Sequence, residues 1–206
     1  MQHDWQERLT NRAAQAAFSP DCDRFIFLRH GQTEHNRQRI CQGHADVPLN
    51  AAGKAQAETA ASIVVELAPP AIRASDLMRV RQTADPVARR LDLSIRTDPQ
   101  LRERAFGIFE NQRIEGRLWS ADHPSVETIE QFVDRSLEGF GAALQQDDVL
   151  LVTHGGLRRV LTAALGIELA DWTAHNALPL QFTRAPSGWT VDARTAGGVW
   201  PADGPE

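Results

Sequence analysis

Cysteine is scarce in this chain, and long apolar runs are missing. The 206 residues include only Cys22 and Cys41, whose spacing fits no metal-ligand pattern. This excludes a disulfide scaffold and disfavours a zinc module. No segment approaches the roughly 18 consecutive apolar residues of a membrane span, and charges interrupt the first residues where a secretory signal has an apolar segment. We therefore expect a cytoplasmic protein with no membrane partner.

Signatures of nucleic-acid and nucleotide binding are also missing. The net charge is -5, which disfavours non-specific binding to nucleic acid. The chain contains neither a Walker loop nor a paired-glycine dinucleotide fingerprint. Apolar residues make up 42% and charged residues 24%, which is typical of a globular protein that needs no disulfide or metal to hold its core. An anionic small molecule remains a suitable ligand, because a local group of arginines can reverse the sign of the field in one cleft.

Apolar strands alternate with amphipathic helices along most of the chain. Asn50 and Ser75 are predicted to cap two of the helices. Strands alternating with helices indicate an α/β domain, in which a mostly parallel central sheet carries helices on both faces. The predicted strands cover 25–28, 71–74 and 149–152, the predicted helices cover 50–67, 75–91, 126–144 and a segment after 154, and a closing hairpin covers 178–191.

The chain divides into three parts. Residues 1–23 are predicted to form an amphipathic N-terminal helical extension, to which the sequence assigns no chemistry. Residues 24–196 contain the alternating pattern and form the α/β domain. Residues 197–206 are rich in glycine and proline, which predicts a flexible tail.

Two segments, FIFLRHG and LLVTHGG, each place a His-Gly pair directly after a buried strand. Parallel strands of one sheet end at a common carboxyl edge, where such folds bind ligands, so His30 and His154 are expected to meet there. The strand-to-helix unit 71–79 brings Arg79 to the same edge, and Arg29 precedes His30. Two guanidinium and two imidazole groups around one point suit a phosphate, because the planar fork of arginine matches phosphate oxygens.

Five motifs occur in the order FLRHGQTEHN, GHADVPLNAAG, SDLMRVRQTA, LRERAFG and VTHGG. Together they resemble the sequential motifs of the histidine phosphatase superfamily, which includes the cofactor-dependent phosphoglycerate mutases, over residues 24 to about 183. The resemblance implies a phosphoglycerate mutase-like three-layer sandwich with a small lid insertion. It also implies a metal-independent phosphatase that needs no cofactor and acts on a small-molecule phosphomonoester through a phosphohistidine.

The resemblance assigns roles residue by residue. His30 would be the nucleophile, Glu103 the general acid, and His154 a stabilising group for the transferring phosphoryl group. Arg29 and Arg79 would bind that group and favour the neutral form of His30. Contacts to phosphate or substrate are implied at Asn36, Gln42, Gly43 and Gly155.

Alternatives remain open for several of these residues. Glu103 lies between Arg102 and Arg104, so a surface ion pair would also explain it. Asn36 would equally suit a turn or a helix cap. A zinc site from His30, His35 and His44 is disfavoured, because no acidic or thiol partner stands at diagnostic spacing.

Two other functions also remain open. The first is a phosphoglycerate mutase-type phosphotransferase. It is disfavoured because the 23 residues between Glu103 and Glu127 lack the arginine pair that grips the substrate carboxylate in the mutases, and a short lid lets the phosphorylated intermediate escape to water. The second is a non-catalytic phosphate-binding adaptor, disfavoured by the intact site residues. The sequence does not name the substrate and leaves the oligomeric state open, with a dimer as one option.

Overall fold

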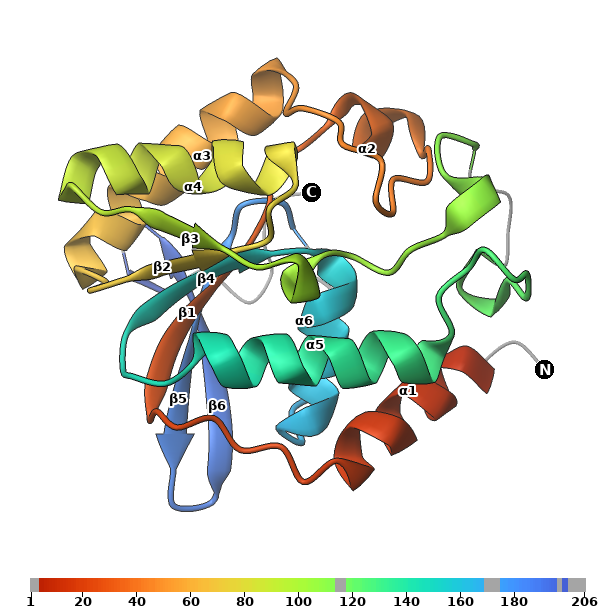
Figure 1. Ribbon diagram of the computed structural model, residues 1–206. Coiled ribbons are helices and arrows are strands. Elements are labelled where there is room, and N and C mark those ends of the chain that lie inside the picture. Colours follow the sequence, from red (N-terminus) through yellow and green to blue (C-terminus); the bar gives the residue numbers. More distant parts are fainter. Residues whose placement is uncertain (1–3, 114–117, 169–174, 196–197, 200–206) are drawn as a thin grey trace.

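A seven-stranded sheet forms the centre of the molecule, with helices on both faces (Figure 1). The computed structural model describes residues 4–113, 118–168, 175–195 and 198–199. In spatial order the strands are β3 (Ile95–Thr97), β2 (Ile72–Ala74), β4 (Val149–Thr153), β1 (Arg24–Arg29), β5 (Pro179–Ala185), β6 (Gly188–Thr195) and β7 (Gly198–Val199). The first four are parallel, and β5, β6 and β7 add antiparallel pairings.

The alternation of side chains along β1 explains why both faces of the sheet are covered. Phe25 and Phe27 belong to one buried cluster, whereas Ile26 and Leu28 belong to the other. Successive residues of a strand point to opposite faces, so an uninterrupted apolar run needs a helical layer on each side. The predicted α/β fold is therefore confirmed.

Two helices cover one face and three cover the other (Figure 1). The first layer consists of α3 (Ala51–Val64), continued by the 3₁₀ turn Val65–Leu67, and α4 (Met78–Leu91). The second consists of α1 (Asp4–Gln15), α5 (Ile129–Ala143) and α6 (Gly155–Ala164). The short helix α2 (Glu34–Gln38) and the 3₁₀ turns Pro99–Leu101, Gly107–Phe109 and Leu118–Ser120 lie in the connections. Within the described part of the chain, no helix has the length and apolar character to cross a bilayer.

Several predicted boundaries need correction. The helix predicted from residue 75 begins at Met78, with Leu77 as its N-cap and no side-chain cap from that residue. Ser75 Oγ accepts from the Leu77 amide at 3.4 Å and lies 3.0 Å from Nε2 of the buried His154 ring, so Ser75 stands in the turn before the helix. The helix predicted from 126 begins at Ile129, where Thr128 and Gln131 form a capping box. The predicted cap at Asn50 is confirmed, since its side chain accepts a hydrogen bond from the Gly53 amide.

The structure describes most of the predicted N-terminal extension but only part of the predicted C-terminal tail. Helix α1 lies within the predicted extension 1–23. Of the tail predicted over 197–206, only Gly198–Val199 are described, and they pair with β6 as β7; the rest lies outside the described residues.

The capping box of α5 gives a stability prediction. Replacing Thr128 with alanine removes a hydroxyl that accepts from the Gln131 amide at 3.1 Å. The expected loss is about 1 kcal/mol in the free energy of unfolding, measured by urea denaturation. Thr59→Ala, inside α3, is the matched control and should not lower stability, because alanine favours a helix interior. Equal losses in the two variants would contradict the capping role.

Candidate active site

A cleft of about 460 Å³ lies where the parallel strands end. Of the described residues, five arginines and two histidines line it, together with one carboxylate, Glu103. Most of the predicted site residues meet here, while His154 lies fully buried next to His30, with 5.3 Å between the ring centroids. The predicted residues on the wall of the cleft are Arg29, His30, Asn36, Gln42, Gly43, Arg79, Glu103 and Gly155.

The main chain around His30 is held from three sides. Its amide donates to the Thr153 carbonyl at 3.0 Å, and its carbonyl accepts from Asn176 Nδ2 at 2.7 Å. The next amide, of Gly31, donates to Thr83 Oγ1 at 2.9 Å. A Cβ at Gly31 would lie 2.5 Å from the Gly53 carbonyl oxygen, so the loop approaches α3 too closely for any other residue.

The hydrogen bond of the His30 ring fixes its tautomer. Nδ1 lies 2.8 Å from the carbonyl oxygen of Gly31. Because a carbonyl oxygen only accepts, Nδ1 carries the proton and Nε2 retains its lone pair. Burial lowers the pKa of His30 well below its usual value, and the charges of Arg79 and Arg29 lower it further. The ring is therefore neutral near pH 7 and has a free nucleophilic nitrogen.

His154 is enclosed by two polar partners. Its Nε2 lies 3.0 Å from Ser75 Oγ, and its Nδ1 lies 3.4 Å from Arg79 Nη2. A guanidinium group only donates, so in this arrangement Nδ1 accepts and the ring proton sits on Nε2. Burial, followed by the charges of Arg79 and His30, lowers the pKa of His154 well below its usual value.

Arg79 is a fully buried cation held by neutral groups. Its guanidinium donates to the carbonyl oxygens of Ala45 and Gly43, each at 2.8 Å. Within the described part of the chain it has no carboxylate partner, and its buried Nε has no hydrogen-bond partner. Burial lowers the pKa of Arg79 to about 10, which leaves it charged at pH 7. Arg29 lies close by, and burial lowers its pKa as well.

Glu103 is positioned by main-chain amides rather than by an ion pair. Its Oε2 accepts from the Gly156 amide and its Oε1 from the Arg104 amide, both at 2.9 Å. The flanking Arg102 pairs with Asp76 instead. The surface ion pair considered from the sequence is therefore not what holds this carboxylate.

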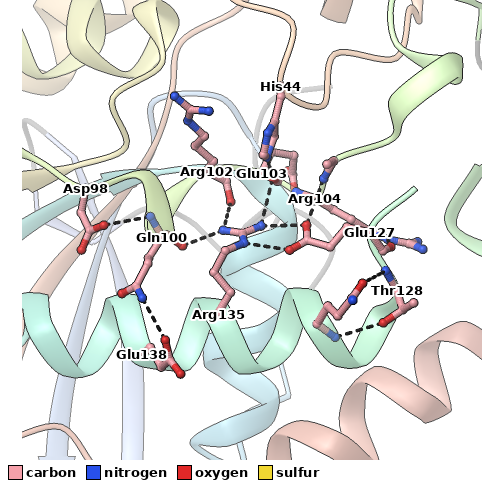
Figure 2. A network of polar contacts seen from close by, with 12 residues as sticks. His44, Asp98, Gln100, Arg102, Glu103, Arg104, Glu127, Thr128, Arg135 and Glu138 are labelled. Atoms are coloured by element: carbon pink, nitrogen blue, oxygen red, sulfur yellow. Dashed lines mark hydrogen bonds and ion pairs between the residues drawn. The ribbon is translucent and has the colours of Figure 1, made fainter. Parts of the chain in front are cut away.

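A polar network supports the main chain of Glu103 (Figure 2). His44 Nε2 donates to the Glu103 carbonyl at 2.8 Å, and Arg135 Nη2 donates to the same oxygen at 3.3 Å. Arg135 is in turn paired with Glu127. This network fixes the segment that carries Glu103, the one carboxylate that the described residues place on the wall.

Three further predicted contact residues, Asn36, Gln42 and Gly43, belong to α2 and the loop that follows it. Asn36 lines the cleft and also completes the capping box of α2 with Thr33, so the two readings of this residue are compatible. Gln42 Oε1 accepts from Thr33 Oγ1 at 2.9 Å. Gly43 has a φ of 49°, and a Cβ there would lie 2.3 Å from Glu110 Oε1, so only glycine fits.

Sequence analysis missed several residues of the site. Ser75 and Thr83 lie inside the motif SDLMRVRQTA, where their hydroxyls position His154 and Gly31. Arg158 and Arg159 follow the second His-Gly pair and line the cleft. For Thr83, Arg158 and Arg159 the available signal is their spacing of one helical turn from Arg79, His154 and Gly155. Ser75 lies before its helix and has no such signal.

The histidines of the loop do not gather as metal ligands. His35 Nε2 contacts Asn111 Oδ1 at 3.0 Å, and His44 is bonded to the Glu103 carbonyl. Across the described ranges, no group of three or more His, Cys, Asp or Glu side chains is arranged to hold a metal ion.

The buried histidines give a prediction on pH. Both pKa values are lowered, so His30 and His154 should stay neutral as the pH falls through 6.5, where histidines of the unfolded chain take up protons. The unfolded state then binds more protons, and the free energy of unfolding should decrease as the pH falls below 6.5. Imidazole NMR signals, assigned by their loss in His30→Asn and His154→Asn, should not shift between about pH 7.5 and 6. A midpoint at 6.5 or above for either ring would contradict this arrangement.

Comparison with known proteins places the chain in a family. Residues 25–194 match the model of the histidine phosphatase superfamily, branch 1. The uncharacterized phosphatase PhoE of Bacillus subtilis is 34% identical over 173 residues, which cover 80% of this chain and 90% of that protein. Agropine synthesis reductase of Rhizobium rhizogenes is 33% identical over 178 residues, or 82% of this chain; the match spans only 41% of that longer protein.

The solved structures agree with this assignment. A mycobacterial glucosyl-3-phosphoglycerate phosphatase in complex with VO3 superposes with a TM-score of 0.65 at 27% identity, covering 84% of this chain and 99% of that one. The chain belongs to the histidine phosphatase superfamily. The family predicted from its motifs is thereby confirmed.

Proposed function

We propose that this member of the histidine phosphatase superfamily is a metal-independent phosphomonoesterase that hydrolyses a small phosphorylated metabolite through a phosphohistidine at His30. The observation that carries the proposal is the state of the His30 ring. It is neutral, its proton lies on Nδ1, and its free Nε2 stands on the wall of a cleft lined by five arginines. Such a site combines a nucleophile with fixed positive charge for a phosphate.

In the first step His30 Nε2 attacks phosphorus in line, and the bond from phosphorus to the leaving oxygen breaks. Glu103 enters protonated and gives that proton to the leaving oxygen. The positive charge that develops on the imidazole is stabilised by the Nδ1 hydrogen bond to the Gly31 carbonyl. Arg29 and Arg79 neutralise the equatorial oxygens, and the N-terminus of α6 at Gly155 faces the same cleft with its partial positive charge.

In this proposal His154 assists by a change of tautomer, in which its ring proton moves from Nε2 to Nδ1. When the phosphoryl group engages Arg79, the Nδ1 of His154 is released to face a phosphoryl oxygen and must then carry a proton. The Ser75 hydroxyl can donate as well as accept, so it can supply a hydrogen bond to Nε2 when the ring proton moves to Nδ1. The contact at 3.0 Å between Ser75 and His154 thus allows either tautomer.

In the second step water attacks the phosphohistidine. Glu103, now a carboxylate, takes a proton from the water, the bond between phosphorus and Nε2 breaks, and neutral His30 is restored as inorganic phosphate leaves. Hydrolysis is favoured over the mutase alternative because Arg104, in the segment after Glu103, donates to the carbonyls of Glu127 and Trp119 instead of offering its charge to a substrate. The buried free thiols Cys22 and Cys41 are in keeping with a cytoplasmic enzyme.

The nucleophile is tested by phosphate release over a panel of phosphomonoesters with EDTA present. The wild-type chain should release phosphate from at least one ester, and His30→Ala should lose at least about 10³-fold in kcat, because the intermediate cannot form. Retention of more than a few per cent of activity would overturn the phosphohistidine mechanism. If no ester is hydrolysed, an assay with 3-phosphoglycerate and a bisphosphate primer tests the mutase alternative. If that assay also shows no activity, the non-catalytic phosphate-binding adaptor is the function that remains.

The acid is tested by varying the leaving group. Glu103→Gln should slow hydrolysis of an alkyl phosphate by about 10²–10⁴-fold. An activated aryl phosphate, whose leaving oxygen hardly needs a proton, should be affected far less. Glu66→Gln, on the exposed surface, is the matched control. Equal losses on the two esters in the Glu103 variant would contradict the role as acid.

A further inference from the structure

Helix α1, outside the catalytic motifs, reaches the wall of the active-site cleft through one side chain. The Trp5 ring stacks on Trp119, with 4.8 Å between centroids and 24° between planes. The guanidinium of Arg159 lies over the Trp5 ring, 5.7 Å from the ring centroid. Trp119 and Arg159 both line the cleft, whereas Trp5 does not.

We propose that Trp5 is a positioning residue that holds Trp119 and Arg159 at the leaving-group end of the cleft, so that the site prefers phosphomonoesters whose leaving group carries a negative charge. This inference deepens the proposed function and rests on it. It needs three steps: that α1 is firmly attached, that Trp119 marks the leaving-group side, and that the charge of Arg159 is available there.

The attachment of α1 comes from burial and from two ion pairs. Leu9 and Ala13 are buried in the core cluster that α5 and α6 share. Arg8 pairs with Glu130 at 2.9 Å, and Arg12 pairs with Asp134 at 2.7 Å, both on α5. Figure 1 shows α1 running beside α5. The helix is therefore a fixed support for Trp5.

Trp119 lies on the side of the cleft where the leaving group departs. A Cβ at Gly156 would come within 2.0 Å of Glu103 Oε1 and 2.9 Å of Trp119 Cη2, so the acid and the indole ring converge on the same glycine. Since Glu103 protonates the leaving oxygen in the proposed reaction, Trp119 borders the leaving group. Its own main chain is held by Arg104, which donates to the Trp119 carbonyl at 2.7 Å.

Among the described residues, none neutralises the charge of Arg159. No described carboxylate forms an ion pair with it, and its side chain is exposed at the cleft. Its contact with the Trp5 ring is a cation–π interaction, which holds the guanidinium without cancelling its charge. Arg29 and Arg79 bind the phosphoryl group in the proposed reaction. Of the other arginines that line the cleft, Arg159 is the one over the Trp5 ring, so we place a second anion, such as a carboxylate on the leaving group, against Arg159.

The test compares two esters that differ in one charge, 4-carboxyphenyl phosphate and 4-carbamoylphenyl phosphate. We define the charge preference as the kcat/KM for the first divided by that for the second. Arg159→Gln should lower the preference about fivefold, and Trp5→Ala about threefold, as expected for a lost cation–π contact, with both effects mainly in KM. The double variant should fall no further than Arg159→Gln alone, because Trp5 acts through Arg159.

Two further variants separate positioning from stability. Trp5→Phe should restore most of the charge preference, because its ring still faces Arg159. Arg12→Gln weakens the docking of α1 on α5 without touching Trp119 or Arg159, so its charge preference should equal that of the wild-type chain, even where Tm decreases. A loss in Arg12→Gln as large as in Trp5→Ala would show a structural role only and overturn the inference.

Binding gives an independent readout. Titration calorimetry in the His30→Ala background compares the Kd values of the two esters without turnover. If the wild-type chain hydrolyses neither ester while the Kd ratio falls in Arg159→Gln, the proposed function fails and the inference on charge stands. If hydrolysis proceeds but Trp5→Ala and Arg159→Gln leave both ratios unchanged, the inference fails and the proposed function stands.

Discussion

The register of β1 on β4 is the constraint on which the site depends. Arg29 stands opposite Thr153, so the two strands end at the same level and the next residues, His30 and His154, become neighbours. A slip of one residue would turn every side chain to the opposite face of the sheet. Phe25 and Phe27 pack under α5 and α6, and the intervening residues pack under α3 and α4. The burial of two different apolar faces therefore holds the two histidines within 5.3 Å of each other.

The same positive charges serve two requirements of phosphoryl transfer. Burial lowers the pKa of His30, and the charges of Arg79 and Arg29 lower it further, which keeps the proposed nucleophile neutral. In the proposed reaction the same two arginines attract the phosphate. A carboxylate beside Arg79 would weaken both effects. The structure instead satisfies this buried guanidinium with the carbonyls of Gly43 and Ala45, which stabilise the cation and leave its net charge intact. Glu103 is likewise held by neutral groups, since each of its carboxylate oxygens accepts a hydrogen bond from a main-chain amide.

The sequence predicts those parts of the molecule that depend on residues close together in the chain. The strands β1 and β4 are continuous apolar runs, and the His-Gly pairs follow them directly, so both the sheet and the meeting of His30 and His154 could be foreseen. Strand β3 has three residues and is largely exposed, which leaves no apolar run to detect. Ser75 was interpreted as a helix cap because a serine before a helix usually is one; its partner, His154, is 79 positions away. The role of Trp5 depends in the same way on distant segments that only the fold brings together.

The short connection between Glu103 and α5 explains why the wall of the cleft draws on other elements. Phe106 and Trp119 from this connection pack edge to face at 5.6 Å, and Arg104 lies over both rings. Arg104 therefore holds this connection together, and its guanidinium cannot also contact a substrate. The inference drawn above assigns the charge for the leaving group to Arg159 on α6 and the support of Trp119 to Trp5 on α1. In the proposed site, α1 supports this wall from behind, since it packs on α5 and its Trp5 stacks on Trp119.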